Sequence, residues 1–186
     1  MKELSLNVLD IAKNSVKAGA SLITITLIEE NGWLTLTIAD NGCGMTSEVV
    51  EAVSNPFYTT RTTRKVGMGI PLLTLAAEQT GGSVRITSRH ESEYPNSHGT
   101  EVVARFNTTH IDFTPIGDLP LTMQTLIMGN PEIDFVFLHK AERYTVELDT
   151  REIRDILGED VSLASYEVLE WILGTLREQY DAGQSY

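Results

Sequence analysis

Residues 22–40 alternate apolar side chains with threonine and other polar residues, and the pair Asn31-Gly32 interrupts this alternation near its middle. A period of two places every second side chain on the same face of a strand, so both halves predict strands with one apolar face. Asn-Gly between two such segments favours a tight hairpin turn. The segment is therefore expected to form an antiparallel β-hairpin.

The segments around this hairpin predict both helices and strands. Apolar residues at helical spacing indicate a helix over 3–18, and Gly19 supplies its C-terminal stop. Pro71 is compatible with a helix only in the first turn, where its missing N–H would have no partner anyway. The other expected elements are helices over 47–53 and 70–80, a polar loop over 54–69, and strands over 83–90 and 99–107. This order predicts an α+β fold, a two-layer α/β sandwich.

The pattern changes near residue 110, and Pro115, Pro120 and Pro131 interrupt the sequence that follows. The next expected elements are a hairpin over 134–149, a short helix over 150–157 and an amphipathic helix over 164–180. Residues 1–109 are expected to form one domain, and residues 110–186 a small C-terminal α+β extension. The extension either packs on the first domain or docks a partner.

Charge is distributed unevenly along the chain, which carries a net charge of −12. Residues 1–109 contain nine basic and eleven acidic side chains, a net −2, whereas residues 110–186 contain five and fifteen, a net −10. The acidic part would repel nucleic acid and anionic lipid, so a polyanionic ligand is expected only in the first part. Without a recognisable signal peptide or membrane span, and with the single Cys43, a cytoplasmic protein is expected.

Four polar residues, Asn7, Asp10, Asn14 and Lys17, are spaced three, four and three apart on the first expected helix. This spacing places them on one face. A carboxylate, a carboxamide and an amine there could orient a water molecule, ligate Mg²⁺ and contact a phosphate. Alone, the spacing is also typical of the solvated face of an amphipathic helix.

Asp40 ends a strand and precedes Gly42 and Gly44. Its carboxylate could accept a hydrogen bond from the exocyclic amine of adenine, while the two glycines would let the backbone approach a flat ring. A turn that needs positive φ angles explains these glycines as well.

Gly67-Met68-Gly69 leads into the helix expected from Ile70. The N–H groups and the positive dipole end of a helix N-terminus favour an anion such as phosphate, although a loop and a helix cap would have the same composition. The remaining candidates are Arg61, Arg64 and Lys65, just upstream, as phosphate contacts, and Gly99-Thr100 at the start of the last strand of the first domain.

These motifs in this order resemble the GHKL (Bergerat-fold) superfamily, which includes DNA gyrase, Hsp-type chaperones, histidine kinases and MutL-type mismatch-repair proteins. The segment from Asn14 to Met45 is similar to MutL, and "NPFYTTR", "GMGIPL" and "AAEQTGGSVRITS" are similar to sensor histidine kinases. The resemblance covers about residues 4–106. It implies a Bergerat ATP-binding fold with ATP and Mg²⁺ as cofactors.

The resemblance also implies individual roles. Asn14 matches the Mg²⁺ ligand and Lys17 a phosphate-contacting lysine. Asp40 matches the adenine-reading aspartate, with Gly42 and Gly44 lining the base. Gly67 and Gly69 match glycines of the phosphate lid, and Thr100 matches a threonine near adenine.

Two residues depart from the family pattern. Asp10 stands where ATP-hydrolysing relatives usually carry glutamate as the general base, and it is one methylene shorter. Pro71 replaces the third lid glycine and removes one N–H donor. Both changes are expected to impair fast hydrolysis more than nucleotide binding, because a catalytic group misplaced by about 1 Å can cost roughly 10²-fold in rate.

The resemblance implies a histidine-kinase-like regulatory protein. Because the first motif begins by Asp10, no room is left before it for a helical hairpin with a phosphoacceptor histidine. Phosphorylation or ATP-dependent control of a separate protein partner is therefore expected, as in anti-sigma-factor serine kinases. The alternatives are a nucleotide sensor without catalysis and a slow ATPase that works as a dimer clamp, so a homodimer is also open.

Overall fold

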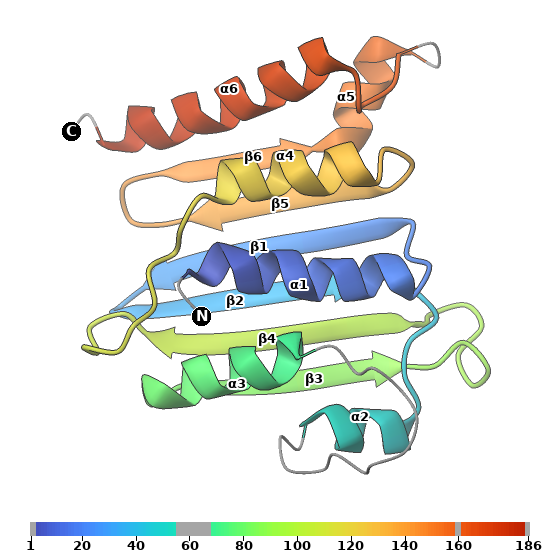
Figure 1. Ribbon diagram of the computed structural model, residues 1–186, viewed down its shortest axis with the longest axis vertical. Helices are drawn as coiled ribbons and strands as arrows, with labels where there is room; N and C mark the ends of the chain where they lie inside the picture. The colour runs from blue at the N-terminus through green and yellow to red at the C-terminus, as the bar shows by residue number, and fades with distance from the viewer. Residues whose placement is uncertain (1–2, 55–67, 159–160, 185–186) are drawn as a thin grey trace.

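The computed structural model describes residues 3–54, 68–158 and 161–184, which form a six-stranded sheet with helices packed against it (Figure 1). The elements expected from the sequence are confirmed to within two residues, except that the last helix continues to Gln184. The loop expected over 54–69 lies outside the described residues except at its ends. In chain order the elements are α1 (Leu4–Lys17), β1 (Leu22–Glu30), β2 (Trp33–Asp40), α2 (Ser47–Ser54), α3 (Gly69–Gln79), β3 (Ser83–Arg89), β4 (Gly99–Asn107), α4 (Leu119–Gly129), β5 (Asp134–Lys140), β6 (Thr145–Asp149), α5 (Thr150–Leu157) and α6 (Tyr166–Gln184).

The strands are ordered β3-β4-β2-β1-β5-β6 across the sheet. Strands β1 and β2 form the expected hairpin, and positive φ angles of 52° at Asn31 and 76° at Gly32 confirm its tight turn. Strand β5 pairs with β1 in parallel, whereas the other pairs among the described strands are antiparallel. The C-terminal hairpin β5–β6 therefore continues the sheet of the first 109 residues.

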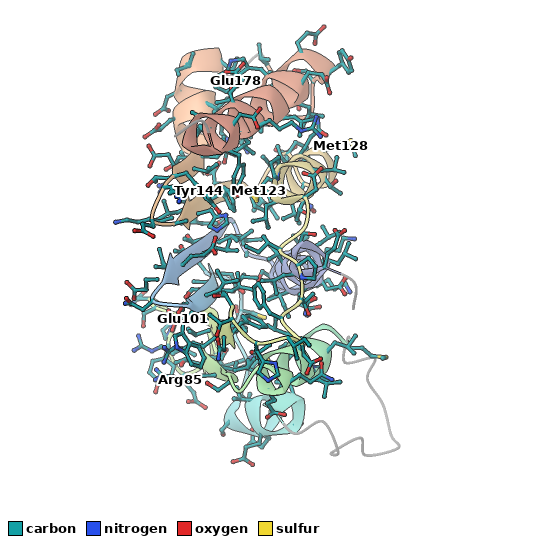
Figure 2. The ribbon with its side chains drawn as sticks, turned by 90° about the vertical axis from the view of Figure 1, so that its left-hand side faces the viewer. Arg85, Glu101, Met123, Met128, Tyr144 and Glu178 are labelled. Carbon is teal, nitrogen blue, oxygen red and sulfur yellow. The ribbon has the colours of Figure 1, made fainter. Side chains whose placement is uncertain are left out.

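The apolar face of the sheet packs against helices α1, α3 and α4, which lie on one side of it, as does α2 (Figures 1 and 2). Alternate residues of each central strand are fully buried on this side, because the period of two brings them to the helix-covered face. This arrangement confirms the predicted two-layer sandwich. The buried strand residues include Ile23, Ile25, Leu27, Leu34, Leu36, Ile38, Val102, Ala104, Phe106, Phe135 and Phe137.

Helix α4 was not predicted from the sequence, because prolines flank and enter its segment. Pro120 lies in its first turn, where a missing N–H costs no helical hydrogen bond. Asp118 caps the helix, its Oδ1 accepting a hydrogen bond from the Leu121 N–H at 2.9 Å. The helix is then held by its buried side, which includes Met123 and Leu126. Prolines that suggested an irregular segment thus mark the start of a helix.

A cluster of polar and aromatic side chains joins the C-terminal elements to the first hairpin. His139 on β5 is buried, with Nε2 2.8 Å from Glu29 Oε1 and Nδ1 2.8 Å from Tyr180 Oη. Tyr144 donates a hydrogen bond to the same Glu29 oxygen at 2.9 Å. The hydrogen bond with His139 lowers the pKa of Glu29, whereas burial raises the pKa of Tyr144 and of Tyr180. These contacts link β5 and α6 to the C-terminal end of β1.

None of the helices in the described ranges is long and apolar enough to cross a membrane.

Candidate functional site

The carboxylate of Asp40 is held in place at the end of β2 by three donors. Its Oδ2 accepts a hydrogen bond from the Ser15 hydroxyl of α1 at 2.6 Å. Its Oδ1 accepts from the backbone N–H of Gly42 at 2.9 Å and of Thr100 at 3.3 Å. Residues 25 and 60 positions away thus converge on one side chain, which gives it a defined orientation for a ligand.

The turn after Asp40 needs glycine for two different reasons. Gly44 has a φ of 70°, and a Cβ there would lie 1.9 Å from the Arg89 carbonyl oxygen. A Cβ on Gly42 would lie 2.8 Å from the Ala18 carbonyl oxygen, at the end of α1. The turn therefore packs closely between α1 and β3. Gly44 has the positive φ expected of a turn glycine, and it also lines the cavity described next.

A cavity of about 240 Å³ opens between α1, the Asp40 turn and the short helix α2. Asp40, Asn14, Gly44 and Thr100 all line it, so the structure brings four of the sequence-predicted residues together. The volume is below the roughly 300 Å³ at which complete ligand pockets begin. Most of the remaining wall is apolar, from Ile11, Ala18, Ile38, Met45, Val49, Val53, Ile70 and Val102.

The N-terminus of α3 packs against the polar side of α1. A Cβ on Gly69 would lie 3.3 Å from Asp10 Cβ, a tight contact, and 3.9 Å from Asn14 Nδ2, an ordinary one. Asp10 itself is exposed, and Asn14 is partly buried. Asp10, Asn14 and the N-terminus of α3 therefore lie next to each other, and of these Asn14 and Ile70 of α3 line the cavity.

Other expected residues are not part of this arrangement. Lys17 is exposed and does not line the cavity. Asn7 is 1% exposed, and its Nδ2 has no hydrogen-bond partner among the described residues. The polar residues of α1 therefore do not form one solvated face. Four further candidates lie outside the described residues, namely Arg61, Arg64, Lys65 and Gly67.

Two serines of the site were not among the predicted residues. Ser15 is 4% exposed and bonds Asp40, and its signal in the sequence was a polar residue at a position of the apolar helical pattern. Ser88 on β3 accepts a hydrogen bond from the Met45 N–H at 2.7 Å and lies 2.9 Å from the Thr100 hydroxyl. An alternating strand sequence contains no sign of this second role, because it depends on the neighbouring strand.

The site offers oxygen ligands but no preformed metal cage. Across the described ranges, no group of three or more His, Cys, Asp or Glu side chains could hold a metal ion. Asp10 and the Asn14 carboxamide are hard oxygen donors of the kind that Mg²⁺ prefers when the remaining ligands are phosphate and water. The residues present therefore fit a magnesium ion that arrives with a nucleotide.

Comparison with known proteins identifies a family that the chain matches and a protein of similar sequence. Residues 2–110 match the family described as histidine kinase-, DNA gyrase B-, and HSP90-like ATPase. A protein of Shewanella frigidimarina (strain NCIMB 400) described as a sensor protein is 28% identical over 89 residues, or 47% of this chain. The match spans only 14% of that protein's length.

Two solved structures share the fold at low sequence identity. The N-terminal domain of a DNA repair protein is 15% identical with a TM-score of 0.56, over 86% of this chain and 58% of that one. The Aquifex aeolicus MutL ATPase domain, complexed with ADP, is 16% identical with a TM-score of 0.56, over 84% of this chain and 69% of that one. Both likenesses cover more of the chain than the first 109 residues, so the shared fold extends beyond the region of sequence resemblance.

Proposed function

Because the chain belongs to the family of histidine kinase-, DNA gyrase B- and HSP90-like ATPases, we propose that it binds ATP with Mg²⁺ in the cavity beside Asp40. The observation that carries this proposal is the Asp40 carboxylate, oriented by three donors at the wall of a mostly apolar cavity. A mostly apolar cavity with a fixed carboxylate acceptor suits a purine that carries an exocyclic amine. Gly44 would then border the base, with Thr100 beside it, while Gly42 packs against Ala18 and holds the Asp40 carboxylate through its N–H.

The phosphate end of the nucleotide is assigned to the mouth of the cavity. There Gly69 opens α3, whose N-terminal N–H groups favour an anion. Asn14 would ligate the magnesium ion, which neutralises phosphate charge when it is bound. The basic residues Arg61, Arg64 and Lys65 are proposed as further phosphate contacts, and the ADP bound in the MutL relative supports a nucleotide in this fold.

Calorimetric titration tests this assignment directly. ATP is expected to bind more tightly with Mg²⁺ than without it, and Asn14→Ala should remove most of that difference while leaving metal-free binding nearly unchanged. A Lys13→Ala variant, on an exposed position of the same helix outside the cavity, is the matched control. If Asn14→Ala retained the full magnesium effect, Asn14 would not be the ligand.

We further propose that the bound nucleotide serves regulation of a separate protein partner, by phosphoryl transfer or by ATP-dependent binding. The sequence match to a sensor protein supports this direction. In phosphoryl transfer, Asp10 would accept the proton of the attacking hydroxyl, since it is the carboxylate beside the α3 N-terminus.

A nucleotide sensor without catalysis is the second candidate, favoured by the short side chain of Asp10 and by its exposure. Incubation with γ-labelled ATP and cell extract separates the two. Kinase activity predicts a labelled partner that disappears with Asp10→Ala while ATP affinity is kept. A sensor predicts no label and no turnover, but ATP-dependent partner capture. Turnover without any labelled protein would instead support the slow ATPase.

A further inference from the structure

The loop between β3 and β4 reaches back to the turn that follows Asp40. It lies at the same end of the sheet as the chain leaving β2 (Figure 1). The strand register pairs Thr100 with Asp40, and a Cβ on Gly99 would clash with the Asp40 carbonyl oxygen. The end of the loop is therefore held against the end of β2, which brings His98, one residue earlier, to the turn.

His98 forms a hydrogen bond with the backbone of this turn. Its Nδ1 lies 2.6 Å from the Gly42 carbonyl oxygen, and the imidazole is partly buried. A carbonyl oxygen only accepts hydrogen bonds, so Nδ1 must carry the proton. Both the neutral Nδ1–H tautomer and the imidazolium ion meet this requirement. The contact therefore determines which ring nitrogen is protonated when His98 is neutral.

Gly42 needs such a restraint because it has no side chain to limit its backbone. A Cβ there would lie 2.8 Å from the Ala18 carbonyl oxygen, so the position requires glycine, the residue with the greatest backbone freedom. Its N–H donates to Asp40 Oδ1 at 2.9 Å, and the next N–H, of Cys43, donates to the Ala18 carbonyl oxygen at 2.9 Å. His98 holds the remaining polar group of Gly42, its carbonyl. The residue that donates to the Asp40 carboxylate is thus held by contacts on both sides.

We propose that His98 is a specificity-determining residue of the nucleotide site, which acts on adenine through Gly42 and Asp40. It does not line the cavity, so it is a positioning residue and does not contact the base. A carboxylate that is in place before the ligand arrives loses less conformational freedom on binding, which favours the ligand whose amine needs that acceptor. This inference rests on the proposed function, since it requires that Asp40 bind adenine.

Two substitutions separate the hydrogen bond from the imidazole ring. His98→Leu removes the donor, whereas the Nδ2 of His98→Asn stands as many bonds from the backbone as the imidazole Nδ1 and donates in its place. In calorimetric titration, His98→Leu should weaken ATP binding about three- to tenfold, the range of one neutral hydrogen bond, and His98→Asn should stay within about twofold of wild type. The preference for ATP over GTP should fall in His98→Leu and be kept in His98→Asn.

The effect of Mg²⁺ distinguishes this role from a general loosening of the site. Because the metal is assigned to the phosphate end, the factor by which Mg²⁺ tightens ATP binding should be the same in both variants as in wild type. His90→Ala is the matched control, since His90 belongs to the same loop and its Nδ1 lies 2.8 Å from the Ser92 hydroxyl within that loop. It should bind both nucleotides as wild type does, and circular dichroism should show all three variants folded.

Nitrogen-15 spectra of histidine-labelled protein without nucleotide test the hydrogen bond itself. In alkaline buffer, where imidazole is neutral, His98 should carry its proton on Nδ1. A proton on Nε2 would overturn the proposal. So would a wild type that binds ATP while His98→Leu stays within about twofold of it, an equal loss in His98→Asn, or a reduced Mg²⁺ effect. Wild-type protein that bound no ATP would refute the proposed function together with the role of His98.

Discussion

Replacement of Asp40 by asparagine is the sharpest test of the nucleotide site, because it keeps the side chain's size and removes its charge. The carboxylate accepts hydrogen bonds from Ser15, Gly42 and Thr100. An amide offers one oxygen in place of two, so at least one donor or the ligand's amine then faces an NH₂ group. The substitution should therefore weaken adenine binding, because the exocyclic amine of adenine needs a hydrogen-bond acceptor.

The magnitude follows from the kind of hydrogen bond that is lost. A hydrogen bond to a charged group contributes about 1.5–3 kcal/mol, and each 1.4 kcal/mol changes Kd tenfold, so ATP affinity should fall roughly 10- to 100-fold. GTP carries an oxygen where adenine has its amine, so wild-type protein should bind it weakly. Asp40→Asn should therefore weaken the binding of ATP more than the binding of GTP, so that the preference for ATP over GTP falls.

Calorimetric titration of both nucleotides against wild type and Asp40→Asn measures this preference. Glu101→Gln provides a matched control, since it removes one carboxylate charge from the strand next to β2 on the opposite face of the sheet. The control should bind ATP as wild type does. The reasoning fails if Asp40→Asn binds ATP within about threefold of wild type, a difference of well under 1 kcal/mol, or if wild type binds GTP as tightly as ATP.

Further predictions concern stability, at two glycines and at two titratable side chains. Gly44→Ala should lower the free energy of unfolding by about 2 kcal/mol or more, because Gly44 has a positive φ and a Cβ would clash with Arg89 at the end of β3. Gly174 in α6 has open space around it, so Gly174→Ala should raise the free energy of unfolding by about 1 kcal/mol. Thermal melts measure both changes. The lowered pKa of Glu29 stabilises the fold above pH 4.5, and this contribution is lost as pH falls through the lowered pKa. In the Glu29→Gln variant, the free energy of unfolding measured in urea should no longer show this fall at acid pH. The raised pKa of Tyr144 stabilises the fold below pH 10 and is lost above it, so a Tyr144→Phe variant with the wild-type alkaline limb would contradict that assignment.

Several features of the site could be predicted because their causes lie within a few residues. Asp40 was found as a carboxylate at a strand end before glycines, and its neighbour Gly44 does need a positive φ. Asn14 was found by its helical spacing, and it lines the cavity. The roles of these residues toward ATP remain predictions, to be tested as described above.

Other features depend on contacts between distant segments. Ser15 bonds Asp40 only because α1 crosses the end of β2. Lys17 shares the spacing of Asn14 but lies outside the cavity, since the rotation of α1 against the sheet decides which side chain faces inward. His139, one of four histidines with no distinguishing context in the sequence, is buried because β5 pairs in parallel with β1.

The sequence by itself determined the elements, their order and the turn chemistry, since hydrophobic period, caps and glycine conformations act over a few residues. It also determined the family, through short motifs in a particular order. Only the tertiary structure decided that the C-terminal hairpin joins the first sheet beside β1, that a proline-rich segment becomes α4, and which polar groups meet at Asp40. Pairing of strands more than one hundred residues apart depends on the complementarity of whole faces, which no local pattern contains.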